Sequence, residues 1–230
     1  TERLENYLQA DRQRGFDLSK APLMRASLLR TAEDSHEFVW SWHHLILDGW
    51  SFSILLKEII TIYNNLCDER VAPMRPARQY VDYIKWLEQQ ELSEAESYWR
   101  GVLRGISKLT ALAADGGAQA SGDDTLQVEK SRELSLETTA SMQQLAHSHG
   151  LTLNTLAQGA WALPLSRYTG ERKVVFGSPV SGRGIDLAGV EEMVGVFINT
   201  LPVRVDVDES EEVLSWLKRL QAEQAEARQH

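Results

Sequence analysis

The sequence contains only one cysteine, Cys67, among its 230 residues. A single cysteine excludes an internal disulfide framework and any metal site built from several thiolates. Low cysteine content also favours a reducing compartment, and we expect a cytoplasmic protein. No apolar run approaches the roughly 20 residues that a membrane helix needs. The opening residues are polar, so we expect neither a membrane span nor a secretory leader.

An excess of positive charge is also missing. The chain has 24 Lys and Arg residues against 33 Asp and Glu residues, which gives a formal net charge of −9. This balance argues against a nucleic-acid partner, because no basic face is left to replace the counterions of phosphate. What the sequence does have is an ordinary globular composition, with 43% hydrophobic and 25% charged residues. A chain of this length can bury a large core without a disulfide or a metal.

The spacing of apolar residues predicts helices interleaved with strands. We expect helices at residues 2–14, 51–66, 79–103, 135–149, 153–168 and 211–227, and strands at residues 23–29, 37–43, 126–134, 173–180 and 197–205. Between the two halves lies DGGAQASGDD, in which three of ten residues are glycine and none is large and apolar. That composition is typical of a linker. The pattern therefore predicts an α/β protein (α+β, two-layer) in two parts.

Two residues bear on the geometry of the predicted helices. Ser51 is a suitable N-cap for the helix that follows it. Pro164 lies inside the predicted helix 153–168, where it cannot donate a hydrogen bond to the carbonyl of Ala160. We expect a kink there, at a cost of about 3 kcal/mol.

The adjacent histidines His43 and His44 form the most informative pattern, within WHHLILDGWS at residues 42–51. Neighbouring residues in a strand face opposite sides, so both rings cannot serve one centre while the strand stays extended. If the strand reaches His44, that ring lies with the aromatic side chains of residues 38–42. Loss of water there would disfavour its charged form and leave a neutral base. Asp48 can bring a carboxylate near; a core histidine with a turn aspartate remains the alternative.

Other kinds of site find little support in the sequence. GSPVSG at residues 177–182 has proline and valine where a serine-hydrolase elbow needs its short turn. The same stretch has the glycine spacing of a phosphate-binding loop, but Arg183 and Gly184 replace the required Lys and Ser or Thr. No third ligand at a usual spacing completes a metal site with the two histidines. We expect no bound metal or nucleotide.

Several stretches resemble motifs of the condensation domains of nonribosomal peptide synthetases. Residues 42–51 carry HHxxxDG, YVDYIKW at 80–86 is similar to Y-x-D-Y-x-x-W, and VGVFINTLPVR at 194–204 is similar to V-G-x-F-x-N-T-L-P-x-R. Residues 15–25 and 177–183 also match sequences typical of the family, and the motifs occur in the same order along the chain as in the family. The superfamily includes epimerization domains and shares the fold of chloramphenicol acetyltransferase. The resemblance covers nearly the whole chain.

The resemblance implies a V-shaped pair of acetyltransferase-like lobes with a tunnel between them. Residues 1–112 would be the latter part of the first lobe, 113–123 a linker, and 124–230 the beginning of the second lobe. Because the family domain is longer on both sides, the chain would be its middle. The upstream motif whose arginine is expected to pair with Asp48 would then be missing, and we expect the isolated chain to be inactive.

The resemblance also implies amide-bond formation. An upstream peptidyl carrier domain would bring an aminoacyl or peptidyl thioester on phosphopantetheine, and a downstream carrier domain would bring the attacking amine. No cofactor would bind directly, and an adenylation domain is expected in the same chain. His44, the second histidine of the motif, would be the catalytic residue, either accepting a proton from the amine or orienting it.

The remaining motif residues receive supporting roles from the same resemblance. His43 and Asp48 would be structural, with Asp48 holding the loop, and Gly49 would permit a tight backbone. Three further residues would line the tunnel or support its wall: Trp50, Arg183 and Asn199. The residues 47–50, LDGW, look most like the subtype that accepts a D-configured donor.

Three other functions compete with this interpretation. An epimerization domain shares the double histidine, although NTLPVR at residues 199–204 favours condensation. An acyltransferase of the same superfamily would use coenzyme A in place of a carrier domain. A non-catalytic lobe pair that only binds carrier domains is the third, and the intact His44, Asp48 and Gly49 argue against it.

Overall fold

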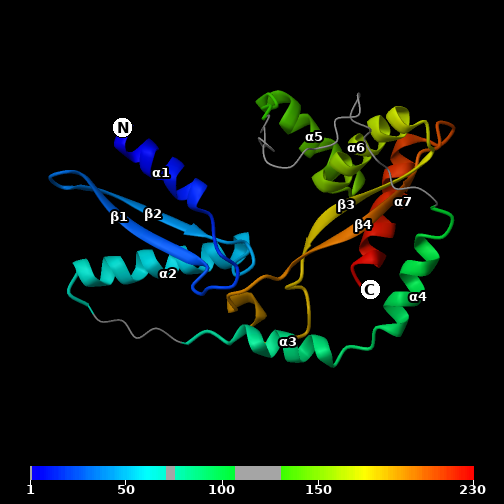
Figure 1. Cartoon of the computed structure of the whole chain (residues 1–230). Helices are drawn as coiled ribbons and strands as arrows, with labels where there is room; N and C mark the ends of the chain where they lie inside the picture. The colour runs from blue at the N-terminus through cyan, green and yellow to red at the C-terminus, as the bar shows by residue number, and fades with distance from the viewer. Residues whose placement is uncertain (1, 71–75, 107–130) are drawn as a thin grey trace. The chain divides into compact units, whose positions relative to one another are not determined.

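The computed structural model describes residues 2–70, 76–106 and 131–230 (Figure 1). The chain forms two compact units, each built from two stretches of sequence. The first unit contains residues 1–90 and 180–199, and the second contains residues 91–179 and 200–230. The predicted linker at 113–123 lies outside the described residues, and the proposed lobe boundaries remain a prediction.

The first unit carries a two-stranded antiparallel sheet with helices on both sides. Its elements are α1 (Glu2–Arg14), β1 (Met24–Ala32), β2 (Ser35–Trp42), α2 (Gly49–Cys67), α3 (Tyr80–Glu88) and the short 3-10 helix η1 (Val190–Glu192). Side chains alternate between the faces of a strand. On one face, the hydroxyl of Tyr7 in α1 bonds that of Ser27 in β1. On the other, Phe52 of α2 stacks on Trp42 at 4.9 Å between ring centroids.

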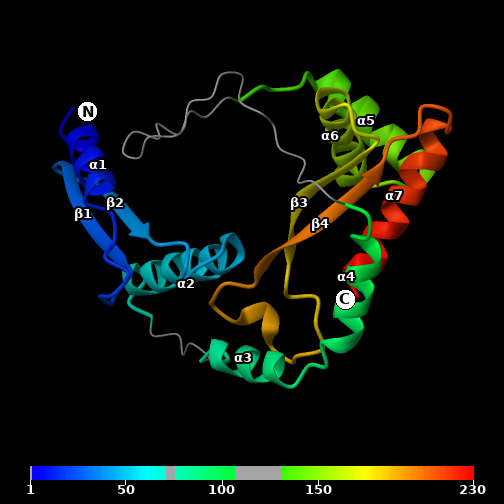
Figure 2. The same ribbon diagram turned by 45° about the vertical axis from the view of Figure 1, so that its right-hand side comes forward.

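The second unit is mainly helical. It contains α4 (Ser93–Val102), α5 (Leu136–His149), α6 (Leu153–Thr169) and α7 (Val213–Ala227), together with most of β3 (Lys173–Ser181) and β4 (Ile198–Asp206). The two strands pair with each other. Figure 2 shows α5, α6 and α7 grouped around them.

The core of the second unit forms between these strands and helices. Val174 of β3 and Val203 of β4 are fully buried, as is Ala162 of α6. Leu217 and Leu220 of α7 close the same cluster. Gly159 of α6 is needed for this packing, because a Cβ there would lie 2.7 Å from Cδ2 of Leu217. Across the described residues, no helix combines the length and hydropathy needed to cross a bilayer.

Most predicted elements are confirmed, including the helix that Ser135 caps by accepting a hydrogen bond from Thr138 N–H. The single helix predicted at 79–103 is wrong. It divides into α3 and α4 because the N–H groups of Gln89 and Gln90 bond carbonyls three residues back, and this tight turn ends α3. Residues 131–134 do not form a strand, and the rest of the strand predicted at 126–134 lies outside the described residues. α6 runs through Pro164 as one helix.

Candidate functional site

The histidine motif occupies the connection between β2 and α2 in the first unit. β2 ends at Trp42, and residues 43–46 form a turn that Ile46 N–H closes by bonding the carbonyl of His43 at 3.1 Å. Leu47 follows with only 4% of its surface exposed. The chain is therefore anchored immediately after the turn, and α2 begins two residues later at Gly49.

The two histidines lie differently from the strand-based expectation. The backbone N–H of His43 bonds the carbonyl of Leu23 at 2.9 Å, and its Nδ1 accepts the N–H of Leu45 at 3.1 Å. The ring also meets Phe16 edge to face. His44 is exposed in the turn, so the strand does not reach it and the condition for placing its ring among the aromatic residues of β2 is not met. The physical reason is that the strand has already ended, and strand alternation does not extend into a turn.

Asp48 is the N-cap of α2, the role that the sequence suggested for Ser51. Its Oδ1 accepts the N–H of Ser51 at 2.8 Å, and its Oδ2 accepts the N–H of Phe197 at 2.9 Å. Burial acts to raise the pKa of Asp48 and is the largest single influence. The hydrogen bonds from the N–H groups of Ser51 and Phe197 are the largest of the opposing influences, the nearby Arg183 charge adds to them, and the pKa lies below its ordinary value.

Arg183 lies beneath the motif with 3% of its surface exposed. Its Nη1 donates to the carbonyls of Val190 at 2.6 Å and Met193 at 3.0 Å. Its Nη2 lies 3.6 Å from Oδ1 of Asp48. The guanidinium also stacks over the ring of Phe197, 3.9 Å from its centroid. The expectation that the arginine partner of Asp48 lies in a missing upstream motif is wrong for this structure, which pairs Asp48 with Arg183.

Ser51 is the residue at this site that the sequence did not identify beyond a helix cap. Its side chain is fully buried. Its hydroxyl donates to the carbonyl of Gly195 at 2.7 Å and accepts the N–H of the same residue at 3.0 Å. It also accepts a hydrogen bond from Nη2 of Arg183 at 2.9 Å. The signal in the sequence was the small polar residue three positions after the motif aspartate.

Gly195 explains why the second and third motifs occur together. A Cβ on Gly195 would lie 2.1 Å from Cδ2 of Tyr80, the first residue of α3. The hydroxyl of Tyr80 donates to the carbonyl of Val196 at 2.6 Å. Phe197 packs edge to face against the same ring at 5.2 Å. Glycine is required at 195 because α3 packs directly against this backbone.

The other predicted site residues lie at exposed positions. Trp50 is 54% exposed, and its Nε1 donates to the carbonyl of Glu191 at 3.0 Å. Asn199 is exposed near the start of β4. Among the described residues, a Cβ on Gly49 would meet no atom within 4 Å, and the backbone there is not left-handed. Nothing in the described structure therefore requires glycine at position 49, in contrast to the predicted tight backbone.

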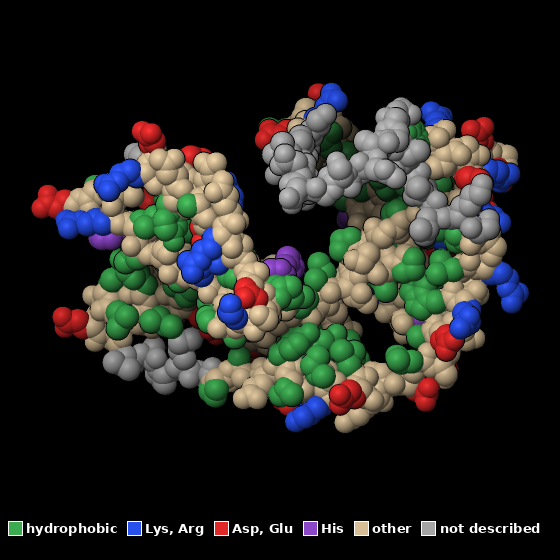
Figure 3. Space-filling view, in the orientation of Figure 1, with side chains coloured by type: hydrophobic (Ala, Val, Ile, Leu, Met, Phe, Trp, Pro, Cys, Tyr) green, Lys and Arg blue, Asp and Glu red, His purple; other side chains and the backbone are tan. Residues whose placement is uncertain are grey.

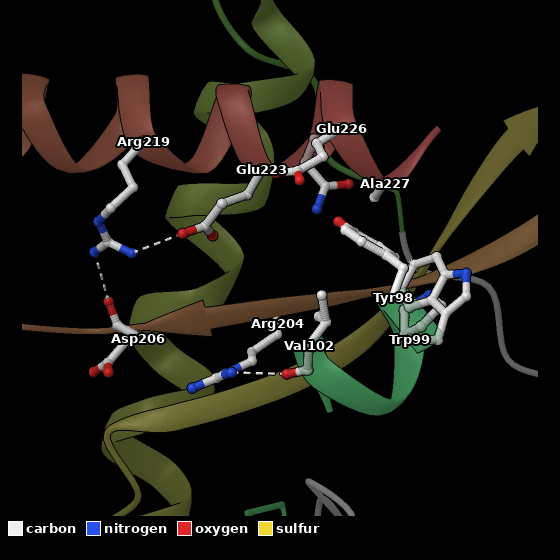
Figure 4. Close-up of a pocket in the computed structure, with 11 residues that line it drawn as sticks. Tyr98, Trp99, Val102, Arg204, Asp206, Arg219, Glu223, Glu226 and Ala227 are labelled. Atoms are coloured by element: carbon white, nitrogen blue, oxygen red, sulfur yellow. Dashed lines mark hydrogen bonds and ion pairs between the residues drawn. The ribbon is translucent and has the colours of Figure 1, made fainter. Parts of the chain in front are cut away.

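A pocket of about 330 Å³ lies elsewhere, in the second unit. α4, β4 and α7 line it, and Tyr98 and Trp99 project into it from α4 (Figure 4). Arg204 donates to the carbonyl of Val102 across its floor at 2.7 Å. None of the residues predicted for the site lines this pocket. In the described part of the chain, no cluster of three or more His, Cys, Asp and Glu side chains could hold a metal ion.

Comparisons with known proteins identify the family. The condensation-domain family model matches residues 1–230. Bacitracin synthase 3 of Bacillus licheniformis is 42% identical over 97% of the chain, and the match spans 4% of that protein. Surfactin synthase subunit 3 of Bacillus subtilis is 39% identical over the whole chain, which spans 18% of it.

Solved structures agree on the fold. The first condensation domain of the CDA synthetase superimposes with a TM-score of 0.75 at 23% identity, over 97% of this chain and 51% of that one. The X-domain of teicoplanin biosynthesis, solved in complex with OxyB, gives a TM-score of 0.76 at 26% identity over 98% of this chain and 52% of that one. The chain thus spans about half of each solved domain, with the mixed α/β, chloramphenicol acetyltransferase-like fold. It belongs to the condensation-domain family of the nonribosomal peptide synthetases.

Proposed function

We propose that this chain forms part of a condensation domain that makes peptide bonds between two carrier-bound substrates. The observation that supports this most strongly is that the turn carrying His44 is held by contacts at both of its ends. His43 ties its beginning to Leu23, and the buried Asp48 network ties its end to Phe197 and Arg183. A turn held at both ends is suited to general acid–base chemistry by the histidine that it carries, because proton transfer needs the base within hydrogen-bond reach of the substrate.

In the proposed reaction, the acceptor amine attacks the thioester carbonyl of the donor. The new C–N bond forms, the C–S bond breaks, and the proton lost by the amine finally reaches the sulfur of the leaving phosphopantetheine thiol. His44 either accepts that proton or orients the amine for attack. His43, Asp48 and Arg183 act by holding the turn; the burial of Arg183 supports this role over lining the tunnel.

We also propose that the rest of the domain covers surfaces that are open in this chain. The solved domains are about twice as long as the part that the chain matches. α2 leaves Ile60, Tyr63 and Leu66 at least half exposed, and apolar side chains gather on the surface over α2 and α3 (Figure 3). Such apolar faces are usually buried in interfaces. In this proposal the same covering excludes water from His44, and the isolated chain is inactive.

The partners and the donor belong to the same proposal. Because the relatives are large synthases of which the chain matches a small part, we propose carrier domains upstream and downstream and an adenylation domain in the same protein. Trp50 and Asn199 remain candidates for the tunnel wall. The LDGW sequence at residues 47–50 supports a donor of D configuration.

The test uses the intact protein that contains this chain, with donor and acceptor carriers loaded separately. We expect a dipeptidyl product on the acceptor carrier, faster with a D-configured than with an L-configured donor. Exchange of the donor α-hydrogen with solvent deuterium, without amide formation, would instead show epimerization. Product formed from free acyl-coenzyme A, without a donor carrier, would instead show a coenzyme A-dependent acyltransferase. Equal rates for the two donors would overturn only the stereochemical part.

A binding function is the second candidate, and one comparison favours it. The X-domain of teicoplanin biosynthesis has this fold and is solved in complex with OxyB. If the intact protein binds loaded carriers without releasing any condensation product, this alternative replaces peptide-bond formation. The exposed His44 would then have no chemical role.

A further inference from the structure

The hydroxyl of Ser51 joins two segments that are far apart in the sequence. A serine hydroxyl has one donor hydrogen and two acceptor lone pairs. In Ser51 the hydrogen goes to the carbonyl of Gly195, and the lone pairs receive the N–H of Gly195 and Nη2 of Arg183. Every hydrogen-bonding position of this fully buried group is therefore used.

The two bonds to Gly195 have a specific mechanical effect. The N–H and the carbonyl of one residue belong to successive peptide planes, which rotate independently about φ and ψ. Glycine has the widest choice of these angles. One oxygen that holds both groups fixes the orientation of both planes. Asp48 alone would fix the two Gly195 planes less firmly. Its N–H reaches the carbonyl of Gly195 at the longer distance of 3.3 Å, and its carboxylate bonds only Phe197 in residues 195–197.

The segments held together in this way both lead to site residues. The anchored motif segment follows directly on the His44 turn, and residues 195–197 continue into β4 at Ile198 and Asn199. All of these residues belong to the first unit. A change in the Gly195 planes would change the direction in which β4 begins and therefore the position of Asn199 relative to His44.

We propose that Ser51 is a positioning residue for the condensation reaction: its hydroxyl fixes the start of β4 relative to the turn that carries His44. This inference rests on the function proposed above. Ser51 touches no substrate and acts through Gly195. Because a displacement of about 1 Å at a reacting centre can cost about 100-fold in rate, loss of the hydroxyl should slow the chemical step without weakening carrier binding.

The test compares Ser51→Ala with Ser53→Ala in the intact protein, with loaded carriers as substrates. Ser53 is a matched control, because it lies on the same turn of α2 but is exposed, and its one hydroxyl bond within the described ranges goes to the carbonyl of Gly49 in its own helix. We expect Ser51→Ala to lower kcat by about 10- to 100-fold, with KM for the acceptor carrier within about twofold of wild type. Ser53→Ala should change neither constant.

A double-variant cycle separates positioning from general loss of structure. If Ser51 acts by placing groups around His44, adding Ser51→Ala to His44→Ala should cause no further loss of the residual rate, whereas independent effects would multiply. Should Ser51→Ala fail to fold, Ser51→Cys keeps a polar atom in the buried space and enters the same cycle.

The outcomes distinguish this inference from the function on which it rests. Normal kcat in Ser51→Ala beside a slow His44→Ala would overturn the positioning role alone, and so would multiplicative effects in the double variant. Full activity of His44→Ala would overturn the proposed role of His44 and, with it, this inference.

Discussion

Replacing Asp48 by alanine should remove three interactions at once. The N-terminus of α2 loses its cap, a contribution of about 1 kcal/mol. The buried N–H of Phe197 loses its acceptor, which costs about 1–3 kcal/mol. Arg183 keeps its buried charge without the carboxylate 3.6 Å away, and removal of one member of a buried ion pair costs about 3–5 kcal/mol.

These contributions share atoms and cannot simply be added. We expect a total loss of about 3–5 kcal/mol, a large part of the roughly 5–15 kcal/mol that keeps a typical domain folded. The measurement is urea unfolding of the intact condensation domain, together with its soluble yield. Asp17→Ala is the control, because its carboxylate also accepts hydrogen bonds and pairs with Lys20 but lies on the surface; its unfolding free energy should stay close to wild type.

A second variant tests whether the ion pair is the main cause. Arg183→Met in the Asp48→Ala background removes the uncompensated charge, so the double variant should lose less stability than the two single losses combined. A decrease of less than about 1 kcal/mol in Asp48→Ala would refute the reasoning, because a group with these buried partners could not then be holding the motif.

Two further predictions concern the same network. The folded pKa of Asp48 lies below its ordinary value of 3.8, so its stabilising contribution is present above pH 3.8 and is lost as the pH falls through the folded pKa. The free energy of unfolding, measured from neutral pH downwards, should show this loss in wild type and not in Asp48→Asn. Parallel plots of that free energy against pH for the two proteins would contradict the prediction. Gly195→Ala should destabilise the domain by about 1–3 kcal/mol, since its Cβ would overlap the ring of Tyr80. Gly184→Ala is the control, because a Cβ at position 184 would meet no described atom within 4 Å. Thermal melts should show a lower midpoint for Gly195→Ala and an unchanged midpoint for Gly184→Ala. Equal effects of the two substitutions would count against the close packing of α3.

The order of helices and strands was predictable because it depends on local patterns. The apolar spacing located α1 and α6, and Ser135 marked the start of α5. Local patterns could not show that one predicted helix would divide into α3 and α4, because the division depends on a short turn in a stretch that is helix-favouring on both sides. They also left open whether the strand predicted at 37–43 reaches His44; β2 ends at Trp42, where the chain must turn to reach Gly195.

The partners at the site were beyond the reach of sequence spacing. Asp48 and Phe197 are separated by 149 positions, and no periodicity relates them. The motifs indicated that both regions matter, but not that Arg183 lies under Asp48 or that Ser51 bonds both polar groups of Gly195. These contacts are determined by tertiary packing, in which α3 brings Tyr80 against the Gly195 backbone.

The most direct test of the account is the condensation rate of His44→Ala in the intact protein, measured in a single turnover with both carriers loaded. Loss of a positioned acid–base group should lower that rate by about 10²- to 10⁴-fold. The thermal midpoint should stay close to wild type, because the contacts that anchor the turn come from His43 and Asp48. A rate equal to that of wild type would show that the chemistry does not depend on this imidazole.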